Sequence, residues 1–349
     1  MDQVILPIRA KPRVGTLIIS LDFEIYWGIR HLPSADKYRR QLVGARSAVP
    51  ELLKLFTEYG IHATWACVGF LFFDSTERLL RFAPKVIPRY KSIHLSPYRD
   101  LPPDDASETS DSVFFAPSLI RLIAQTPNQE IGSHTFSHYY CLEEGQNLKT
   151  FREDLLAARG TAQSFGLKMR SLAFPQNQVQ ERFLAVCREI GIVAYRGNQD
   201  SRIYRASSEH ERKYVNRLAR FADAYVPLVA TAYPLPRPTS DLPINLPASR
   251  FLRPYSRTSL PFERQRLRRI VRELTHAAQM GLCYHLWWHP HNFGADMHEN
   301  LAFLRRILNH YRALERHYGM RSATMGETAD LVLNLNQVRA EPRADANRA

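Results

Sequence analysis

The chain has 349 residues, of which 45% are hydrophobic, and a formal net charge of +13. This length allows one large domain or two small ones, and the hydrophobic content suffices for a sizeable core. The first residues show neither the apolar stretch nor the cleavage site of a signal peptide, and no run approaches the roughly eighteen apolar residues of a membrane span, so we expect a cytoplasmic protein. The four cysteines are far apart, which favours reduced thiols over a disulfide framework.

The positive charge gathers in one stretch, where eight arginines fall between Arg250 and Arg272. Such a cluster can bind the phosphates of a nucleic acid, a sugar nucleotide or an anionic membrane surface, and it can equally be a solvated helix face. Nucleic acid is disfavoured because no zinc-finger, helix-turn-helix or single-strand-binding motif accompanies the charge. Peripheral contact with the inner membrane surface stays open, and the oligomeric state is not predicted.

Short apolar runs alternate with helical patterns along the chain. The predicted strands are residues 16–22, 61–70, 130–133, 171–174, 192–196, 282–289 and 321–324. Helical patterns occupy residues 50–60, 150–166 and 299–319, and the second of these begins with Thr150 and Glu153 in capping-box spacing. Strands separated by helices of this length indicate a largely parallel sheet, and about seven strands favour a barrel over an open sheet.

Three stretches interrupt the alternation. Residues 87–112 are rich in proline, serine and acidic residues, and residues 226–262 contain repeated prolines, so both are predicted to be long loops. The second loop is expected to lie over one face of the fold. Residues 334–349 have little to bury and are predicted to be a disordered tail, which leaves residues 14–333 as the folded domain.

Two acidic residues end the first predicted strand. Asp22 and Glu24 stand two apart in SLDFEIYWG, at the end of the strand where parallel α/β folds place their sites. Burying unpaired charges costs on the order of several kcal/mol, so carboxylates next to an apolar strand indicate a binding partner. The alternative is a pair of solvated acids at a surface strand end.

A histidine pair follows another strand. His134 and His138 stand four apart in EIGSHTFSHY. On a helical turn, residues i and i+4 point the same way, so both imidazoles could reach one metal ion at about 2.0–2.1 Å. The motif lacks the glutamate of H-E-x-x-H, so a base must come from elsewhere, and Asp22 or Glu24 is available. Two polar residues on a helix edge would also explain the spacing.

A third group lies in YHLWWHPHNFG, which carries His285, His289 and His291. A histidine that titrates near neutral pH is a suitable proton donor to a leaving amine. The structural alternative makes Trp287 and Trp288 one core and one lining residue beside a histidine held by the backbone. Two histidines and a carboxylate around one ion leave a coordination position open, as in catalytic rather than structural zinc sites.

In order and spacing these motifs resemble the polysaccharide deacetylase superfamily, carbohydrate esterase family 4, over residues 14–333. The resemblance implies a distorted seven-stranded (β/α) barrel. It also implies Asp22 of SLDFE as catalytic base, Glu24 as a metal ligand and His289 of LWWH as general acid. HTFSH matches the family's histidine motif, which makes His134 and His138 the other implied ligands of a divalent cation, expected to be zinc.

The chain also departs from the family pattern. D-F-E replaces the usual paired aspartates, which leaves the base and ligand roles exchangeable. The third motif reads AFPQNQ, with Gln176 where an arginine is usual, and Arg170 or Arg196 could substitute for it. The fourth motif has no clear match, although Arg196 and Asn198 in YRGN are candidates for it and, like Gln176, for substrate binding. Together with PASRFLRP and HPHNFG, these features resemble cytoplasmic-type deacetylases of surface-polysaccharide gene clusters.

The expected function is therefore metal-dependent removal of an N-acyl group, chiefly acetyl, from an amino sugar of a surface-polysaccharide precursor. Trp27 is expected to stack on the sugar ring, and His291 and Asn292 to contact hydroxyl groups or orient the general acid. Arg250 and Arg253 in SRFLRP could grip the phosphate of a nucleotide- or polyprenyl-diphosphate-linked substrate, or be pinned to acidic residues.

Two other functions stay open. A glycoside hydrolase could use Asp22 and Glu24 as its carboxylate pair, although residues two apart seldom reach opposed positions about 5–9 Å apart across a glycosidic bond. A carbohydrate-binding barrel without turnover is the second alternative, and Gln176 in the third motif favours it.

Overall fold

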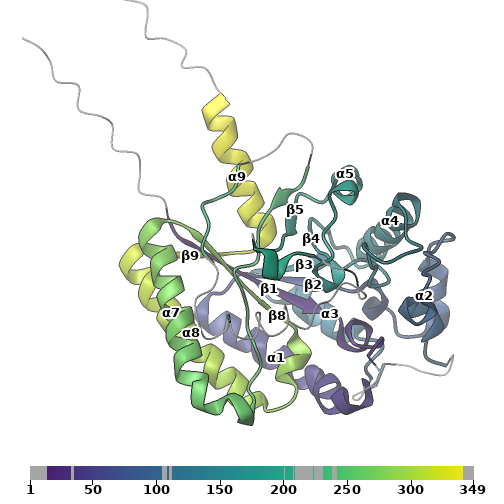
Figure 1. Cartoon of the computed structure of the whole chain (residues 1–349), viewed down its shortest axis with the longest axis horizontal. Helices are drawn as coiled ribbons and strands as arrows, with labels where there is room; N and C mark the ends of the chain where they lie inside the picture. The colour runs from purple at the N-terminus through teal and green to yellow at the C-terminus, as the bar shows by residue number, and fades with distance from the viewer. Residues whose placement is uncertain are drawn as a thin grey trace, which may run out of the picture.

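The computed structural model describes residues 14–32, 35–103, 108–109, 112–199, 201–206, 208, 223, 231–237 and 242–340. Its centre is a curled parallel sheet with the strand order β6-β5-β4-β3-β2-β1-β8-β7, and β9 pairs with β1 (Figure 1). The strands are β1 (Thr16–Phe23), β2 (Ala63–Cys67), β3 (Gln129–Ser133), β4 (Ser171–Ala173), β5 (Ala194–Arg196), β6 (Ile244–Asn245), β7 (Arg250–Phe251), β8 (Cys283–Trp288) and β9 (Arg321–Ala323). All seven predicted strands are present, and the predicted distorted (β/α)7 barrel is confirmed.

Strand β1 is the central strand of the sheet. All eight of its residues are buried, as expected for an apolar strand covered on both faces. One edge of β1 pairs with β8, while the other edge pairs with β9 through residues 16–18 and with β2 through residues 19–23. The carboxyl end of β1 therefore opens between the ends of β2 and β8.

Residues 244–252 join the two edges of the sheet. The amides of Leu246 and Ala248 donate to carbonyl groups at and just after β5, and the amides of Ser249 and Leu252 donate to carbonyl groups of β8. The predicted loop 226–262 thus contains the two short strands β6 and β7, which proline-based reasoning missed. Each of these strands has two residues, too few to show the alternation of apolar and polar residues that identifies a strand. Residues 226–230 and 238–241 lie outside the described residues.

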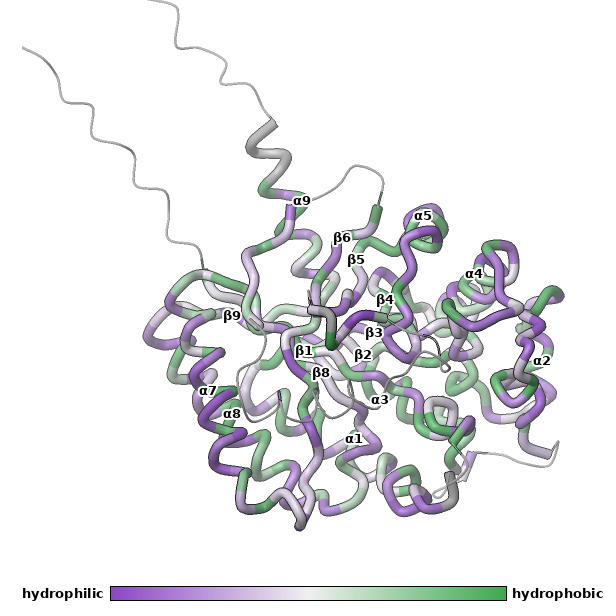
Figure 2. The backbone as a smooth tube through the Cα atoms, in the orientation of Figure 1, coloured by the Kyte–Doolittle hydropathy of each residue, from purple (hydrophilic) through white to green (hydrophobic). Residues whose placement is uncertain are grey.

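Helices surround the strands. They are α1 (Arg39–Tyr59), α2 (Thr76–Phe82), α3 (Pro117–Gln125), α4 (Leu148–Ser164), α5 (Glu181–Ile190), α7 (Glu263–Met280), α8 (Met297–Tyr318) and α9 (Met325–Ala340). The 3-10 turns are η1 (Ile25–Gly28), η2 (Ala35–Tyr38), η3 (Gly69–Phe72), η4 (Ile93–Leu95), η5 (Pro97–Arg99), η6 (Pro175–Asn177), η7 (Arg202–Tyr204), η8 (Arg257–Phe262) and η9 (Pro290–Phe293). Helices α7 and α8 pack together on one flank, and hydrophobic and hydrophilic residues alternate along them (Figures 1 and 2). Each of these helices therefore buries one face and exposes the other.

Several helix boundaries differ from the sequence predictions. Helix α1 begins at Arg39, well before the predicted residue 50, and accommodates Pro50. The capping box of α4 is formed by Asn147 and Thr150, whose side chains bond to each other's amides, instead of by Thr150 and Glu153. Helix α9 continues to Ala340, past the predicted start of the disordered tail, and residues 341–349 lie outside the described residues.

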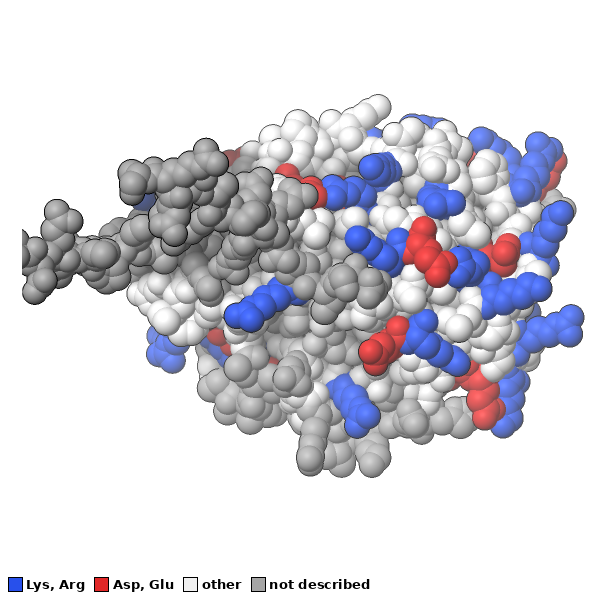
Figure 3. Space-filling view, turned by 90° about the horizontal axis from the view of Figure 1, so that it is seen from above, with Lys and Arg blue, Asp and Glu red and all other residues white. Residues whose placement is uncertain are grey.

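The predicted loop 87–112 holds only the turns η4 and η5 among its described residues. All four cysteines are buried and free. Within the described part of the chain, no helix has both the length and the apolar character that crossing a bilayer requires. On the face shown in Figure 3, basic side chains are spread over the described surface and alternate with acidic ones.

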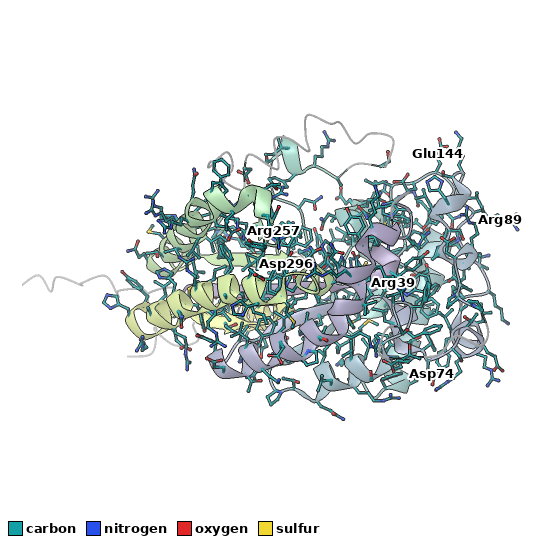
Figure 4. All side chains as sticks on the ribbon, turned by 90° about the horizontal axis from the view of Figure 1, so that it is seen from below. Arg39, Asp74, Arg89, Glu144, Arg257 and Asp296 are labelled. Carbon is teal, nitrogen blue, oxygen red and sulfur yellow. The ribbon has the colours of Figure 1, made fainter. Side chains whose placement is uncertain are left out.

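The arginine-rich stretch divides between surface and interior. Arg264, Arg268 and Arg272 are exposed along α7, as a solvated helix face requires. Arg257 lies on the segment that leads into this helix (Figure 4). By contrast, Arg266 is buried with its guanidinium 4.1 Å from the ring centroid of Phe303. The stretch is therefore not one continuous phosphate-binding surface.

Candidate active site

The predicted polar residues meet at the carboxyl ends of the strands. Asp22 is the second-last residue of β1, and Glu24 directly follows this strand. His134 follows β3 and His289 follows β8. All four lie near one another, as expected when parallel strands end at the same edge of a barrel.

The histidine pair lies on a loop and not on the predicted helical turn. Thr135 and His138 have positive φ angles of 63° and 57°, which a helix does not allow. The buried carboxylate of Asp154, from α4, holds this loop by accepting hydrogen bonds from the amides of Phe136 at 2.7 Å and Ser137 at 3.2 Å. The loop backbone, held in this way, turns both imidazoles toward the barrel axis.

Glu24 lies between the two imidazoles. Its Oε2 is 3.1 Å from Nε2 of His134 and 3.0 Å from Nε2 of His138, and all three side chains are buried. Tetrahedral metal–ligand bonds of about 2.0–2.1 Å would put the ligand atoms about 3.3 Å apart. The two distances from Oε2 are close to that value, and the three ligand atoms all lie within 4.8 Å of one another.

The hydrogen-bonding states of the three residues also fit a cation. His134 Nδ1 is 2.9 Å from the carbonyl oxygen of Ala173, which can only accept, so Nδ1 carries a proton and Nε2 is the nitrogen that could bind a cation. Burial lowers the pKa of His138 to about 4, so this ring is neutral at pH 7. Burial raises the pKa of Glu24, but the neighbouring histidines, His289 first, lower it to well below its usual value. A carboxylate facing two imidazole lone pairs is the donor set of a divalent-metal site.

Asp22 is bound by an arginine from β5. Arg196 Nη1 and Nη2 donate to the two carboxylate oxygens at 2.6 and 2.7 Å, and Nη2 also donates to Asn177 Oδ1 at 3.1 Å. Burial, the largest single influence, raises the pKa of Asp22, but Arg196, His134 and His289 together lower it by more, so the pKa lies below its usual value. The other sequence candidate, Arg170, pairs with Asp330 on the α9 side, away from Asp22.

His289 faces both acidic residues. Its Nε2 is 3.4 Å from Glu24 Oε1 and 3.8 Å from Asp22 Oδ2, and its side chain is 23% exposed. Asn292 Nδ2 lies 3.4 Å from His289 Nδ1, and the His291 ring stacks on that of His289 with the centroids 5.1 Å apart. His291 is buried, and its Nδ1 has no hydrogen-bond partner among the described residues.

A cavity of about 610 Å³ opens over these residues. Its lining includes Asp22, Glu24, Gln176, Asn177, Asn198, Phe251, Trp287, His289, His291 and Asn292. Asn198 is tied to the carbonyl oxygen of Asn177 at 3.0 Å, and Gln176 has a left-handed backbone with φ 55°. The cavity thus brings Asp22, Glu24 and His289 together with four of the predicted substrate contacts, which are Gln176, Asn198, His291 and Asn292.

Two predicted substrate contacts are wrong. Trp27 has no exposed surface, because it packs against Phe70 and Phe114 and donates its Nε1–H to the Phe114 carbonyl at 2.9 Å, so no face is left for a sugar. Arg250 is buried in bonds to Glu273 and does not line the cavity. Pairing of this arginine with acidic residues was the alternative to phosphate binding that the sequence left open, and the structure agrees with that alternative.

Arg253 does not line the cavity either. Because the Arg250 guanidinium is bound to Glu273, a phosphate grip at this site would be left to Arg253 alone, and for that residue it stays a prediction.

Sequence reasoning missed two residues of the site and left the position of a third open. Asp154 is a lone acid on a helix and carries no motif. Asn177 could be found only by asking which side chain follows Gln176 in the turn η6. Trp287 was considered only as core or lining, and the structure makes it the lining residue while Trp288 is fully buried.

Comparison with known proteins agrees with this geometry. Residues 43–195 match the family model described as polysaccharide deacetylase, a range that includes both loop histidines but not Asp22, Glu24 or His289. No curated protein matches the chain in sequence. The sequence match alone therefore covers only part of the site.

Solved structures match nearly the whole chain. A protein from Mycobacterium smegmatis assigned to the polysaccharide deacetylases is 16% identical, with a TM-score of 0.59 and 98% of each chain covered. A Pseudomonas aeruginosa PAO1 protein of the same assignment and Puue allantoinase are each 13% identical, with TM-scores of 0.54 and coverage of 94% of this chain and 92% of theirs. At these identities the likeness concerns the fold. The family-model match thus shows a resemblance to polysaccharide deacetylases over residues 43–195, and the solved structures show the shared fold.

Proposed function

We propose that this chain is a metal-dependent hydrolase that removes an N-acyl group, chiefly acetyl, from an amino sugar. One observation carries the proposal: the ligand atoms of the buried Glu24, His134 and His138 lie within 4.8 Å of one another, and Glu24 borders the same cavity as Asp22 and His289. A general base, a cation site and a proton donor are the parts that amide hydrolysis requires.

The structure also supports one assignment of the two acids. Glu24 Oε2 meets both imidazoles, which favours Glu24 as the metal ligand. Both oxygens of Asp22 are held by Arg196, which favours Asp22 as the base. When bound, the cation, which we expect to be zinc, would supply Lewis-acid activation of a water molecule and of the acyl oxygen.

The chain's own residues would perform the proton transfers. Asp22, kept ionised and oriented by Arg196, takes the proton of the attacking water. His289 Nε2, at the cavity surface, donates a proton to the departing amine. Each such acid–base contribution typically amounts to about 10²–10⁴-fold in rate.

The cavity lining suits a sugar. Trp287 and Phe251 lie with ring centroids 4.7 Å apart and present aromatic surface to the cavity, as sugar-binding platforms do. Asn198 and Asn292 add polar groups for hydroxyls. A surface-polysaccharide precursor in the cytoplasm, with or without a nucleotide or polyprenyl-diphosphate carrier, is the substrate context that the motif resemblance favours.

The test is acetate release from N-acetylated amino-sugar oligomers after chelation and after restoration with zinc, cobalt or manganese. We expect activity to disappear with the metal and to return with it. E24Q and H134A should lose both bound metal and activity. H62A is a matched control, because His62 Nδ1 also bonds to a carboxylate, that of Glu327 at 2.8 Å, but outside the cavity.

Chelation that leaves the rate unchanged would refute the metal role. Release of reducing ends instead of acetate would favour the glycoside hydrolase. A fully metal-loaded protein without acyl release from a broad substrate panel would favour the carbohydrate-binding barrel.

A further inference from the structure

Two buried polar residues lie directly beneath the proposed base. Ser20 precedes Asp22 by two residues on β1, so both side chains point to the same face of the strand. His285 lies on the neighbouring strand β8. Both side chains have no exposed surface, and neither is part of the cavity lining.

These two residues form a chain of hydrogen bonds that ends at Asp22. His285 Nδ1 is 3.1 Å from the Leu246 carbonyl oxygen, and His285 Nε2 is 2.8 Å from Ser20 Oγ. Ser20 Oγ is in turn 3.1 Å from Nη1 of Arg196, the same nitrogen that donates to Asp22 Oδ1.

The direction of every bond in this chain is fixed by its ends. A carbonyl oxygen can only accept, so His285 Nδ1 carries the proton and Nε2 accepts. Arginine can only donate, so Ser20 Oγ accepts from Arg196 and gives its own proton to His285. Burial lowers the pKa of His285 to about 3, so the ring is neutral and has one donor and one acceptor, as the chain requires.

We propose that Ser20 and His285 are positioning residues that hold Arg196 against Asp22 and thereby fix the orientation of the base. This inference rests on the proposed function. The series of hydrogen bonds begins at Leu246, within residues 244–252 that join the sheet edges. The Leu246 amide bonds to β5 and its carbonyl oxygen accepts from His285, so the same residue takes part in joining the sheet and in orienting the base. Asp22 itself touches neither residue, which distinguishes their role from that of a group acting on substrate.

The first test is S20A, which removes one hydroxyl and little volume. We expect kcat to fall by about tenfold, the effect of one lost hydrogen bond to a charged group, while KM and metal content stay at the wild-type value. The matched control is T64A. Thr64 is the register partner of Ser20 on β2, is equally buried, and bonds to Glu130 at 2.8 Å instead of to Arg196. T64A should lower stability and leave kcat unchanged.

The second test replaces the histidine. H285F removes both hydrogen bonds and should lower kcat at least as much as S20A, whereas H285Q keeps one donor and one acceptor and should recover most of the loss. Recovery by glutamine would not be expected if the ring served only as filling for the core. Equal kcat losses for T64A and S20A, or equal losses for H285F and H285Q, would overturn the inference.

A third measurement needs no turnover. In 15N NMR of the histidine rings, His285 should be the neutral Nδ1–H tautomer, and S20A should shift its Nε2 resonance. An Nε2–H tautomer in the wild-type protein would overturn the inference even if the enzyme is active. If the protein shows no deacylation, the proposed function fails, and the NMR result decides the hydrogen-bond chain by itself.

Discussion

Two buried arginines at the barrel make nearly the same bonds and have different surroundings. Arg196, on β5, holds Asp22 through two nitrogens at 2.6 and 2.7 Å. Arg250, on β7, holds Glu273 through two nitrogens at 2.7 and 2.6 Å. Asp22 lines the cavity, whereas Glu273 does not. Arg196 binds its carboxylate through Nη1 and Nη2, and Arg250 through Nε and Nη2. Two similar paired bonds thus hold the proposed base in one place and a strand in the other.

The surroundings explain the difference. Around Glu273 the charges are balanced: Arg269 donates to Glu273 at 2.9 Å and to Asp223 at 3.1 Å, and Tyr284 donates to Glu273 at 2.9 Å. Arg250 also donates to the Asp223 carbonyl, so its nitrogens all bond within the protein. Bonds between β7 and α7 use the donors that a phosphate would need. A paired, enclosed arginine is therefore structural, and one whose carboxylate borders a cavity is functional.

Substitution by lysine should separate the two roles most strongly. Lysine keeps the charge but cannot form the paired bonds of a guanidinium. R196K should lower kcat by about 10²-fold or more, because a base displaced by about 1 Å costs this much. R250K should leave kcat within about twofold. Initial rates at saturating substrate, corrected for the folded fraction, measure both variants.

The same R196K protein should keep its metal, because Arg196 contacts Asp22 and not the ligand cluster. A larger kcat loss for R250K than for R196K would contradict this comparison and show that the bonds between Arg250 and Glu273 affect the site.

Substitution of Arg250 by alanine should have the largest effect on stability. R250A leaves the half-buried Glu273 and the buried Asp223 with fewer cationic partners and should lower the free energy of unfolding by about 3–5 kcal/mol. Urea unfolding followed by circular dichroism measures this loss. The control is R305A, because Arg305 pairs with Glu58 at the surface and should contribute about 1 kcal/mol or less. A small effect of R250A would mean that the cluster does not secure β7.

The sequence could predict those features that depend on local pattern. The seven strands were found because each is an apolar run between helical segments, as in β1. Asp22, Glu24 and the histidines were found because strand ends and motif spacing are visible in one dimension. Parallel strands bring such ends together without further information.

Other features depend on contacts between distant segments. The loop of His134 and His138 takes its shape from Asp154, which no local pattern connects to it. Arg196 was one of two candidates, and only the fold shows that Arg170 reaches Asp330 instead. Trp27 was misjudged because an aromatic residue near a strand end can face either the core or the cavity. Short strands such as β6 escape any periodicity argument.

The two tryptophans offer a milder test of the same distinction between cavity and core. W287F reduces the aromatic surface at the cavity and should raise KM by about three- to tenfold with a small change in kcat, since Trp287 also lies 4.1 Å from the Arg196 guanidinium. W27F should leave KM unchanged and lower stability, because the Phe114 carbonyl loses its donor. Steady-state kinetics with one oligosaccharide distinguish the two. A KM change confined to W27F would restore the original sugar-stacking prediction.

The smallest expected effect is on the pH dependence of stability, which tests the bond between Arg196 and Asp22. Burial, the largest single influence, raises the pKa of Asp22, but Arg196 together with His134 and His289 lowers it by more, so the pKa in the folded chain lies below the ordinary value of 3.8. As pH falls below about 4, the unfolded chain binds a proton on this residue before the folded chain does. The stabilising contribution of Asp22 is therefore complete above its unfolded pKa and is lost as pH falls through its folded pKa.

D22N removes that contribution. The unfolding free energy of D22N, measured in urea with chelator present, should therefore be lower than that of the wild type at pH 7. It should also fall less steeply between pH 5 and pH 3, roughly the window that the unfolded pKa defines. Glu24 retains its own acid dependence in both proteins, and D74N, at an exposed pair with Arg78, should follow the wild-type curve. Parallel curves for D22N and the wild type would mean that Arg196 does not favour the ionised base, and the contrast between the two arginines would then rest on position alone.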